Sequence, residues 1–249
     1  AKSRPKIFFS AGFDIIFTSE SEVTIQQVAK ILQKNSYDFS SVGKIIYKNK
    51  SGKILDNTHF GDIIWDLDQL PIPAWDLLPN ERYWKIGRPH GGGDTISGKE
   101  LKYASMMTSR GCPFACSFCH IADETEKSIS GAIGRFRIKS DERVKKELSI
   151  LKNEIGAKQV FIEDDSIFGM KRRAIRLLKS IVGYGLDLLD VNGVNTIHLV
   201  KKSNKPGWMI PDEELIALLA EVGFKELVLP FETANPRIMK KWCSNKLAL

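Results

Sequence analysis

Apolar residues along the chain follow two spacings, and each spacing predicts one kind of element. Short apolar runs are typical of strands, whereas apolar positions that recur every three or four residues are typical of helices. The predicted strands lie at residues 6–9, 13–17, 42–48, 53–55, 104–108, 159–162, 188–191 and 224–231. The predicted helices lie at residues 25–32, directly after Thr24, and at 140–155, 171–182, 211–222 and 236–246.

The order of these elements divides the chain. From residue 103 onward, strands and helices alternate, which predicts a parallel sheet with right-handed crossovers, either open or curled toward a barrel. Before it, the chain has a turn at 49–52, a proline-containing segment at 67–79 that should be extended, and a glycine-rich connecting stretch at 85–100. We therefore expect an amino-terminal region over 1–82, a linker over 83–102 and an α/β core over 103–249.

Capping signals support the predicted helices. Ser140 can cap the helix that follows it, with acidic residues in the first turn, and Gly156 can end that helix. Gly223 can end the helix of residues 211–222 in the same way.

Polar residues gather where the predicted parallel strands end. Since the carboxyl ends of parallel strands share one edge of the sheet, this pattern predicts a single functional site at that edge. In chain order the residues are the cysteines of 112–119, then Glu163, Asp164 and Asp165, then Asn192, and finally Glu232.

Composition places the chain among ordinary globular proteins. Its 249 residues are 43% hydrophobic and 27% charged, which suffices for one large domain or two modest ones. No apolar run approaches the ~18 residues that a membrane helix needs, and the first residues lack the apolar segment of a signal peptide. We expect a cytoplasmic protein without a membrane partner.

The formal net charge of +7 does not by itself indicate a nucleic-acid partner. The basic residues are spread along the chain, and the densest group falls on one predicted helix. We expect this group to form the solvated face of that helix: Lys171, Arg172, Arg173, Arg176 and Lys179.

The cysteines favour a metal site over a disulfide framework. Cys112, Cys116 and Cys119 fall in one C-x3-C-x2-C loop, whereas Cys243 lies far away and is expected to be a structural thiol. Three thiolates can each bind one iron of a [4Fe–4S] cluster and leave the fourth iron open, as a catalytic centre requires. Zinc is the alternative, with His120 as a fourth ligand, although its place beside Cys119 makes tetrahedral closure awkward.

The loop SRGCPFACSFCH at residues 109–120, with an aromatic residue before its last cysteine, resembles the signature of the radical S-adenosylmethionine (SAM) superfamily. The resemblance implies a partial (βα) TIM-like barrel and a [4Fe–4S] cluster on Cys112, Cys116 and Cys119. It further implies that SAM binds the open iron and is cleaved reductively to a 5′-deoxyadenosyl radical. A reductant such as flavodoxin or ferredoxin is then the expected electron donor.

The same resemblance implies the SAM contacts. Phe118 is expected near the adenine, with the backbone at His120 and the two residues after it along the adenine edge. An acidic element after the second strand binds the SAM amino group in this family. Here that place holds three carboxylates without the family's two glycines, so the acting one stays open: Glu163, Asp164 or Asp165.

Asn192 and Glu232 stand at the ends of the next two strands, where the resemblance implies further polar SAM contacts. The residues themselves leave structural interpretations open. Phe118 also suits a core position, the three carboxylates suit the start of the next helix, and Asn192 with its following glycine suits a turn.

A second resemblance covers residues 11–79. The segments GFDIIF (12–17), SESE (19–22), GKIIY (43–47) and DLDQLPIPAW (66–75) are similar to the region joining a Rossmann-like cobalamin-binding domain to the barrel of B12-dependent radical SAM enzymes. Many members are methyltransferases, which implies cobalamin as a methyl carrier and a small-molecule substrate. The implied fold is the end of a cobalamin-binding-type domain followed by the partial barrel.

The chain departs from that subgroup in several places. Only the last part of a cobalamin domain fits before residue 60, the Asp-x-His-x-x-Gly motif is absent, and four βα units are visible where the family barrel has about six. His59 and the HGGGD stretch at 90–94 are expected on surface loops rather than in a ligand site.

Two other functions remain open from the sequence. A radical SAM methylthiotransferase acting on tRNA or protein would suit the positive charge, but its family carries three further cysteines in the amino-terminal domain, and none precedes Cys112. A non-catalytic metal-binding module is the third possibility. Release of 5′-deoxyadenosine distinguishes that module from the enzymes.

Overall fold

The computed structural model describes residues 2–86, 101–205 and 207–242. Contacts divide the chain into two compact units. The first unit is Ala1–Trp65 with Cys119–Arg135, and the second is Asp66–Phe118 with Phe136–Leu249. The sequence placed a boundary at residue 82, whereas the contacts change at residue 65. Cys243 and the HGGGD stretch lie outside the described residues.

The second unit contains a four-stranded parallel sheet in the order β11-β8-β7-β4. Its strands are β4 (Tyr103–Met106), β7 (Gln159–Ile162), β8 (Asp187–Asp190) and β11 (Phe224–Glu226). All four were predicted, and β7 has the predicted bounds. The parallel α/β core is therefore confirmed, as an open sheet over the described residues.

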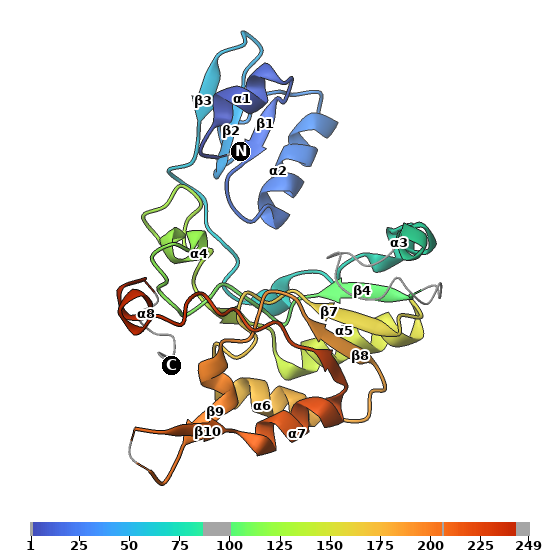
Figure 1. Ribbon diagram of the computed structural model, residues 1–249. Helices are drawn as coiled ribbons and strands as arrows, with labels where there is room; N and C mark the ends of the chain where they lie inside the picture. Colours follow the sequence, from blue (N-terminus) through green and yellow to red (C-terminus); the bar gives the residue numbers. More distant parts are fainter. Residues whose placement is uncertain (1, 87–100, 206, 243–249) are drawn as a thin grey trace. The chain divides into compact units, whose positions relative to one another are not determined.

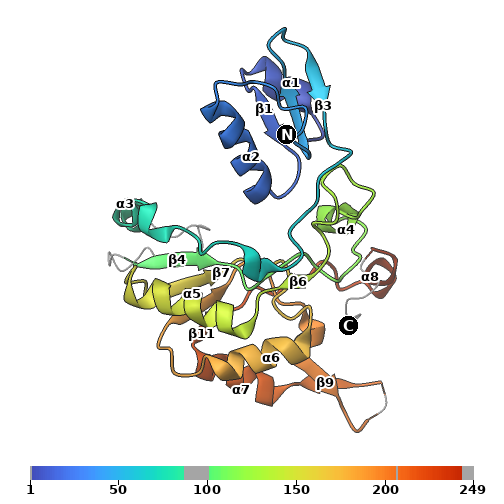
Figure 2. The same cartoon turned by 180° about the vertical axis from the view of Figure 1, so that it is seen from behind.

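Three predicted helices cover one face of this sheet (Figures 1 and 2). They are α5 (Asp141–Asn153), α6 (Lys171–Ser180) and α7 (Glu213–Val222). Ser140 caps α5 as predicted, since its side chain accepts a hydrogen bond from the backbone N–H of Arg143 at 3.0 Å. Gly223 ends α7 in the left-handed conformation, with φ at +109°.

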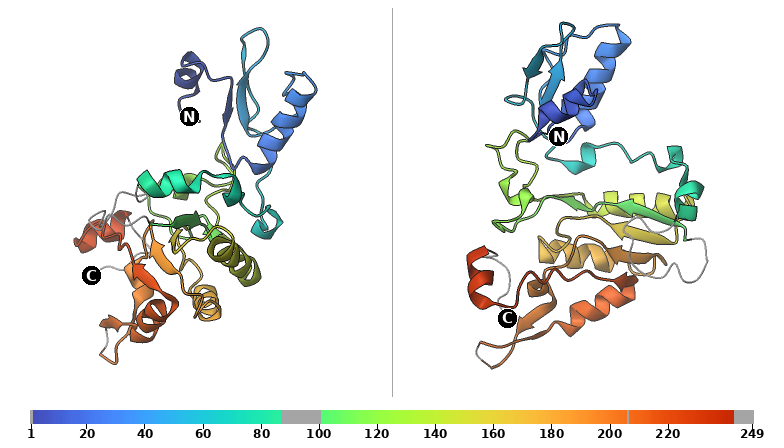
Figure 3. Two further views of the ribbon diagram at one scale, coloured as in Figure 1. Left: turned by 90° about the vertical axis from the view of Figure 1, so that its right-hand side faces the viewer. Right: turned by 45° about the horizontal axis from the view of Figure 1, so that its top comes forward.

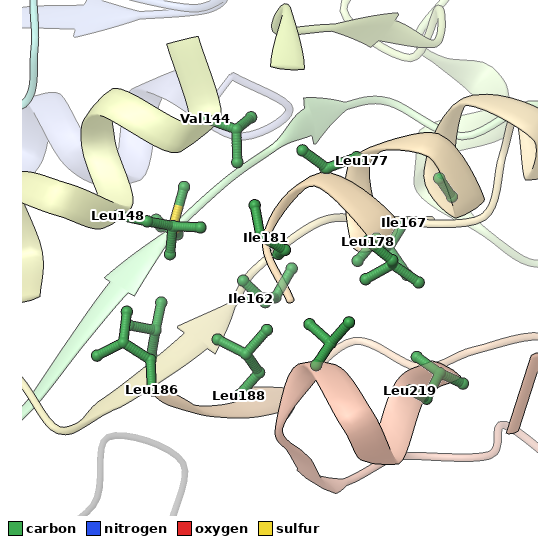
Figure 4. Packing of buried hydrophobic residues seen from close by; sticks show 14 of the residues in the cluster. Val144, Leu148, Ile162, Ile167, Leu177, Leu178, Ile181, Leu186, Leu188 and Leu219 are labelled. Carbon is green, nitrogen blue, oxygen red and sulfur yellow. The ribbon is translucent and has the colours of Figure 1, made fainter. Parts of the chain in front are cut away.

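One continuous core lies between the sheet and these helices. Figure 4 shows leucine, isoleucine and valine side chains from strands and helices meeting in this layer. The labelled residues are Val144, Leu148, Ile162, Ile167, Leu177, Leu178, Ile181, Leu186, Leu188 and Leu219. Close packing of this kind fixes the strand ends, which carry the candidate site.

The prolines predicted an extended segment before β4. Leu70 and Leu78 are extended, but two 3₁₀ turns interrupt the segment, η1 (Leu67–Gln69) and η2 (Trp75–Leu77). The helix α3 (Asn80–Ile86) follows. Indole N–H groups then fix this segment to β4: Trp75 donates to the carbonyl of Ser105 at 3.2 Å and Trp84 to that of Tyr103 at 2.8 Å. Burial of two tryptophans outweighs the local preference for extended backbone.

Several short elements of the second unit were not predicted. The antiparallel pair β9 (Val200–Lys202) and β10 (Met209–Pro211) follows the short η4 (Thr196–Leu199) and lies beside α6 and α7 (Figure 3). A second pair joins β5 (Ser109–Arg110) to β6 (Arg137–Ile138). Strands this short give no alternation for a sequence pattern to reveal. By contrast, the last described element, α8 (Pro236–Trp242), corresponds to the described part of the helix predicted over 236–246.

The first unit has a three-stranded antiparallel sheet, β1 (Ile15–Phe17), β2 (Ile45–Lys48) and β3 (Ile54–Asp56). The predicted turn at 49–52 joins β2 to β3, and the helix α2 (Glu22–Gln33) packs on the sheet through Val28. Antiparallel pairing differs from the parallel repeats of a Rossmann-like domain. The cobalamin-domain assignment therefore stays a prediction.

The predicted strand at 6–9 is wrong, because this segment is the helix α1 (Pro5–Ser10). Pro5 stands in the first turn, where its fixed φ suits a helix and its missing N–H has no cost. Four residues are too few to separate a buried helical turn from a strand by apolar pattern.

The remaining helix of the first unit is α4 (His120–Asp123), in its second segment. Among the described residues, none of the helices has the length and apolar character to cross a bilayer.

Candidate active site

The site begins with Asp164, which follows β7 and is 1% exposed. Its carboxylate accepts hydrogen bonds from the backbone N–H and hydroxyl of Thr108 and from the hydroxyl of Ser109, each at 2.6 Å. Burial raises the pKa of Asp164, while these hydrogen bonds act to lower it. Both carboxylate oxygens thus hold the segment that enters the cysteine loop, so Asp164 is not placed to face a ligand.

Arg173 of α6 completes this buried network, which corrects the prediction that it lies on a solvated helix face. Its side chain is 2% exposed. The guanidinium donates to the hydroxyl of Thr108 at 3.0 Å, to the carbonyl of Thr108 at 3.1 Å and to that of Lys139 at 2.9 Å. Burial lowers the pKa of Arg173, and Asp164 acts to raise it. A buried arginine needs such partners, and a helix pattern cannot reveal them.

Asp165 holds the first residue of the cysteine loop. Its carboxylate accepts the backbone N–H of Gly111 at 2.9 Å. Gly111 has φ at +75°, in the left-handed region that strains residues with a side chain. Asp164 and Asp165 together therefore fix residues 108–111, immediately before Cys112.

Glu163 and Asn192 meet at the same edge of the sheet. The side-chain amide of Asn192 donates to the backbone carbonyl of Glu163 at 2.9 Å, so the ends of β7 and β8 are joined. Asn192 is exposed and Glu163 is half-buried. Glu232 is exposed on the segment between β11 and α8.

The three cysteines differ in burial. Cys116 is 6% exposed, whereas Cys112 and Cys119 are half-buried, and none of the three forms a disulfide. Among the described residues, no three His, Cys, Asp or Glu side chains are gathered in a geometry that could hold a metal ion. By its chemistry the donor set fits a [4Fe–4S] cluster, since it offers three thiols on one short loop. Metal sites commonly take their final geometry only when the metal binds.

Phe118 and His120 lie at the surface of the loop. Phe118 is 53% exposed, which argues against the alternative of a core aromatic residue. His120 is exposed and begins α4. The roles implied for these two residues stay predictions.

Three polar residues at and after the end of β8 were missed by the sequence analysis. Asp190 Oδ1, Asn195 Nδ2 and His198 Nε2 are buried atoms without a hydrogen-bond partner within the described part of the chain. Burial raises the pKa of Asp190 to about 6 and lowers that of His198 to about 4. The available signal was an aspartate that follows two leucines at the end of a strand, since such a residue is seldom buried without a role.

Comparison with known proteins identifies relatives of this arrangement. A family model described as the Radical SAM superfamily matches residues 106–247. A protein of Pyrococcus horikoshii named Uncharacterized methyltransferase PH0819 is 31% identical over 229 residues, covering 91% of this chain and 42% of that protein. The Cytidylyl-2-hydroxyethylphosphonate methyltransferase of Streptomyces wedmorensis is 24% identical over 257 residues, covering 96% of this chain and 44% of that protein. The chain spans less than half the length of these two relatives.

Solved structures with the same fold include two cobalamin-containing enzymes. The cobalamin-dependent S-adenosylmethionine radical enzyme OxsB, with aqua-cobalamin bound, aligns with a TM-score of 0.65 at 17% identity, over 98% of this chain and 32% of that one. The radical S-adenosylmethionine methyltransferase TsrM from Kitasatospora setae, with cobalamin and a [4Fe–4S] cluster bound, aligns with a TM-score of 0.62 at 16% identity, over 96% and 42%. At these identities the likeness concerns the fold.

Proposed function

The chain belongs to the radical SAM superfamily, and on this premise we propose that its protein is a cobalamin-dependent methyltransferase acting on a small molecule. One observation carries the proposal. The C-x3-C-x2-C loop follows the edge strand β4 of a parallel sheet. The carboxylate of Asp165, which follows the neighbouring strand β7, holds Gly111, the residue directly before Cys112. A loop fixed at this edge can present thiolates to a cluster at the place where α/β folds bind ligands.

The cluster and SAM, when bound, supply a one-electron reduction that breaks a carbon–sulfur bond of SAM. In the proposal, Cys112, Cys116 and Cys119 each hold one iron through a thiolate. Among the three carboxylates after β7, we assign the SAM ammonium group to Glu163. Glu163 directly follows β7, at the carboxyl edge of the sheet where α/β folds bind ligands, and Asp164 and Asp165 hold the loop segment.

The remaining predicted contacts follow from exposure at the same edge. Phe118 presents an exposed ring that can stack on adenine. The amide nitrogen of Asn192 binds the carbonyl of Glu163, so its oxygen is the atom proposed to accept a SAM hydroxyl or amine. Glu232 and the backbone at His120 are proposed as further polar contacts.

Cobalamin, the reductant and the substrate class rest on the relatives. Cobalamin is named for OxsB and TsrM, and methyl transfer for TsrM and the Streptomyces enzyme. A flavodoxin or ferredoxin is proposed as the electron donor, which places the reaction in the cytoplasm.

Anaerobic reconstitution tests the cluster. We expect about four irons per chain and an EPR signal that changes when SAM is added. Cys116→Ala should abolish this signal, whereas Cys243→Ala, outside the loop, should retain it. A wild-type chain that takes up zinc but no iron–sulfur cluster would contradict the proposal.

Product analysis separates the enzyme from a binding module. With reductant and SAM, the enzyme should release 5′-deoxyadenosine, and the Cys116→Ala variant should release none. A full-length protein that retains no cobalamin after incubation with hydroxocobalamin and gel filtration would remove cobalamin from the proposal and leave the radical SAM assignment intact.

A further inference from the structure

The middle of the cysteine loop is held by an aromatic stack. Phe114 lies between Cys112 and Cys116 in the chain, with one residue on either side. Its ring centroid is 5.6 Å from that of His198, at an interplanar angle of 58°. His198 also stacks with Phe168, with ring centroids 5.9 Å apart and an interplanar angle of 30°. Through Phe114, the middle of the loop thus contacts the imidazole ring of His198 in the second unit.

The position of His198 is itself well determined. It lies in η4, whose first turn is capped by Asn195, since that side chain accepts the backbone N–H of Ile197 at 3.2 Å. The ammonium of Lys171 donates to the backbone carbonyl of His198 at 2.7 Å and to the carboxylate of Asp212 at 2.9 Å. Lys171 begins α6 and Asp212 caps α7, so contacts from two helices hold the backbone of His198.

The buried imidazole of His198 is suited to packing as a neutral ring rather than to carrying a charge. Its Nε2 is buried without a hydrogen-bond partner among the described residues. Burial and the nearby charge of Lys171 lower the pKa of His198, so the ring is neutral near pH 7. A neutral ring between two phenylalanines stabilises the stack through apolar and quadrupole contacts.

We propose that His198 is a positioning residue of the cysteine loop: through Phe114 it holds Cys112 and Cys116 in place for cluster binding. The inference rests on the proposed function, because it concerns the loop that the cluster is proposed to occupy. The other end of this loop has a separate contact, from the backbone N–H of Ser117 to the carbonyl of Trp242 at 3.1 Å. Loss of the stack therefore frees the centre of the loop while both ends stay held.

The test measures the loop in the metal-free chain, so it does not depend on activity. Cys116 is buried, and its thiol reacts with a maleimide only when the loop opens. We expect His198→Ala to raise the alkylation rate of Cys116 by about fivefold, as loss of an aromatic pair implies. His198→Phe keeps a ring in the stack and should react at the wild-type rate. Peptide mass mapping assigns the rate to Cys116.

A matched control is available in the first unit. His59 contacts Phe60 with ring centroids 5.0 Å apart, and it is exposed. His59→Ala removes an imidazole–phenylalanine contact without touching the loop, so the Cys116 rate should not change. After reconstitution, His198→Ala should also lose iron to a chelator faster than wild type, and His198→Phe should not.

The outcomes decide the inference. Equal Cys116 rates in wild type and His198→Ala would overturn it, as would a His198→Phe variant as reactive as His198→Ala. If His198→Ala does not unfold cooperatively, Phe114→Leu tests the same contact from the loop side and must reproduce the faster alkylation. A wild-type chain that binds no cluster would remove the proposed function, while the alkylation rates would still decide whether His198 positions the loop.

Discussion

Arg173 in the second unit and Lys44 in the first unit satisfy their buried charges in different ways. In the second unit, Arg173 lies between the edge of the sheet and α6, and its buried charge faces that of Asp164 across the shared hydroxyl of Thr108. In the first unit, Lys44 is 9% exposed, and its ammonium donates to the backbone carbonyl of Thr58 at 3.0 Å. The first arrangement joins strands and a helix through opposite charges, whereas the second satisfies a charge with a neutral acceptor.

The cores of the two units explain why this difference matters. The second unit has one continuous core between a parallel sheet and three helices, whereas two small clusters stabilise the described part of the first. A large core can offset the desolvation of an ionic network and hold it in a single geometry. We infer that the second unit provides the rigid part of the site.

The largest expected effect comes from breaking the ionic network. Arg173→Met leaves Asp164 buried without its cation, which should lower the free energy of unfolding by about 3–5 kcal/mol. Denaturant unfolding measures this change. Arg172, the exposed neighbour on the same helix, is the matched control, and Arg172→Met should stay within about 0.5 kcal/mol. Similar losses in both variants would mean that the network is not a source of stability.

The burial of Arg173 also shows which features of the fold the sequence could not predict. The bounds of β7 and the capping of α5 by Ser140 were predictable, because apolar runs and cap residues act locally. The burial of Arg173 was not, because its partner Asp164 belongs to another element and meets it only in the folded sheet. The same limit applied to the acidic triplet: its place at the sheet edge was predicted, but not which carboxylates hold the loop.

The next effect is a pH dependence of stability confined to the second unit. Asp190 has a folded pKa raised to about 6, above the unfolded value of ~3.9, so its contribution falls as pH rises through this range. His198 has a folded pKa lowered to about 4, below the unfolded ~6.5, so its contribution rises with pH over nearly the same range. The two slopes oppose each other in the wild type.

Single variants should expose each slope. Relative to wild type, Asp190→Asn should make stability rise with pH between about 4 and 6, by about 1 kcal/mol per pH unit. His198→Phe should make it fall with pH by a similar amount. Chemical denaturation at half-unit pH steps measures both, and taking differences from wild type removes the background of other carboxylates. Slopes of the same sign in the two variants would contradict the assignment.

A smaller effect is expected at the entrance of the cysteine loop. Gly111 has φ at +75°, so Gly111→Ala should cost about 1–2 kcal/mol of stability through backbone strain. Gly12→Ala in the first unit is the control for backbone strain alone. Gly12 has φ at +95°, and an added Cβ would have no atom within 4 Å. Both substitutions should destabilise the chain similarly, but only Gly111→Ala should reduce iron uptake. Equal iron uptake in the two variants would mean that the left-handed backbone at Gly111 does not position the loop for the cluster.

The smallest expected effect tests the comparison from the side of the first unit. Lys44→Met removes an ammonium whose hydrogen bond is to a carbonyl, and it keeps a side chain of similar length and apolar stem. Because no buried carboxylate loses its partner, the free energy of unfolding should change by less than about 1 kcal/mol, in either direction. Thr58→Ala serves as the control, since it keeps the backbone carbonyl that accepts this hydrogen bond. A loss as large as that of Arg173→Met would show that Lys44 neutralises a negative charge in the assembled protein, and the contrast between Arg173 and Lys44 would then disappear.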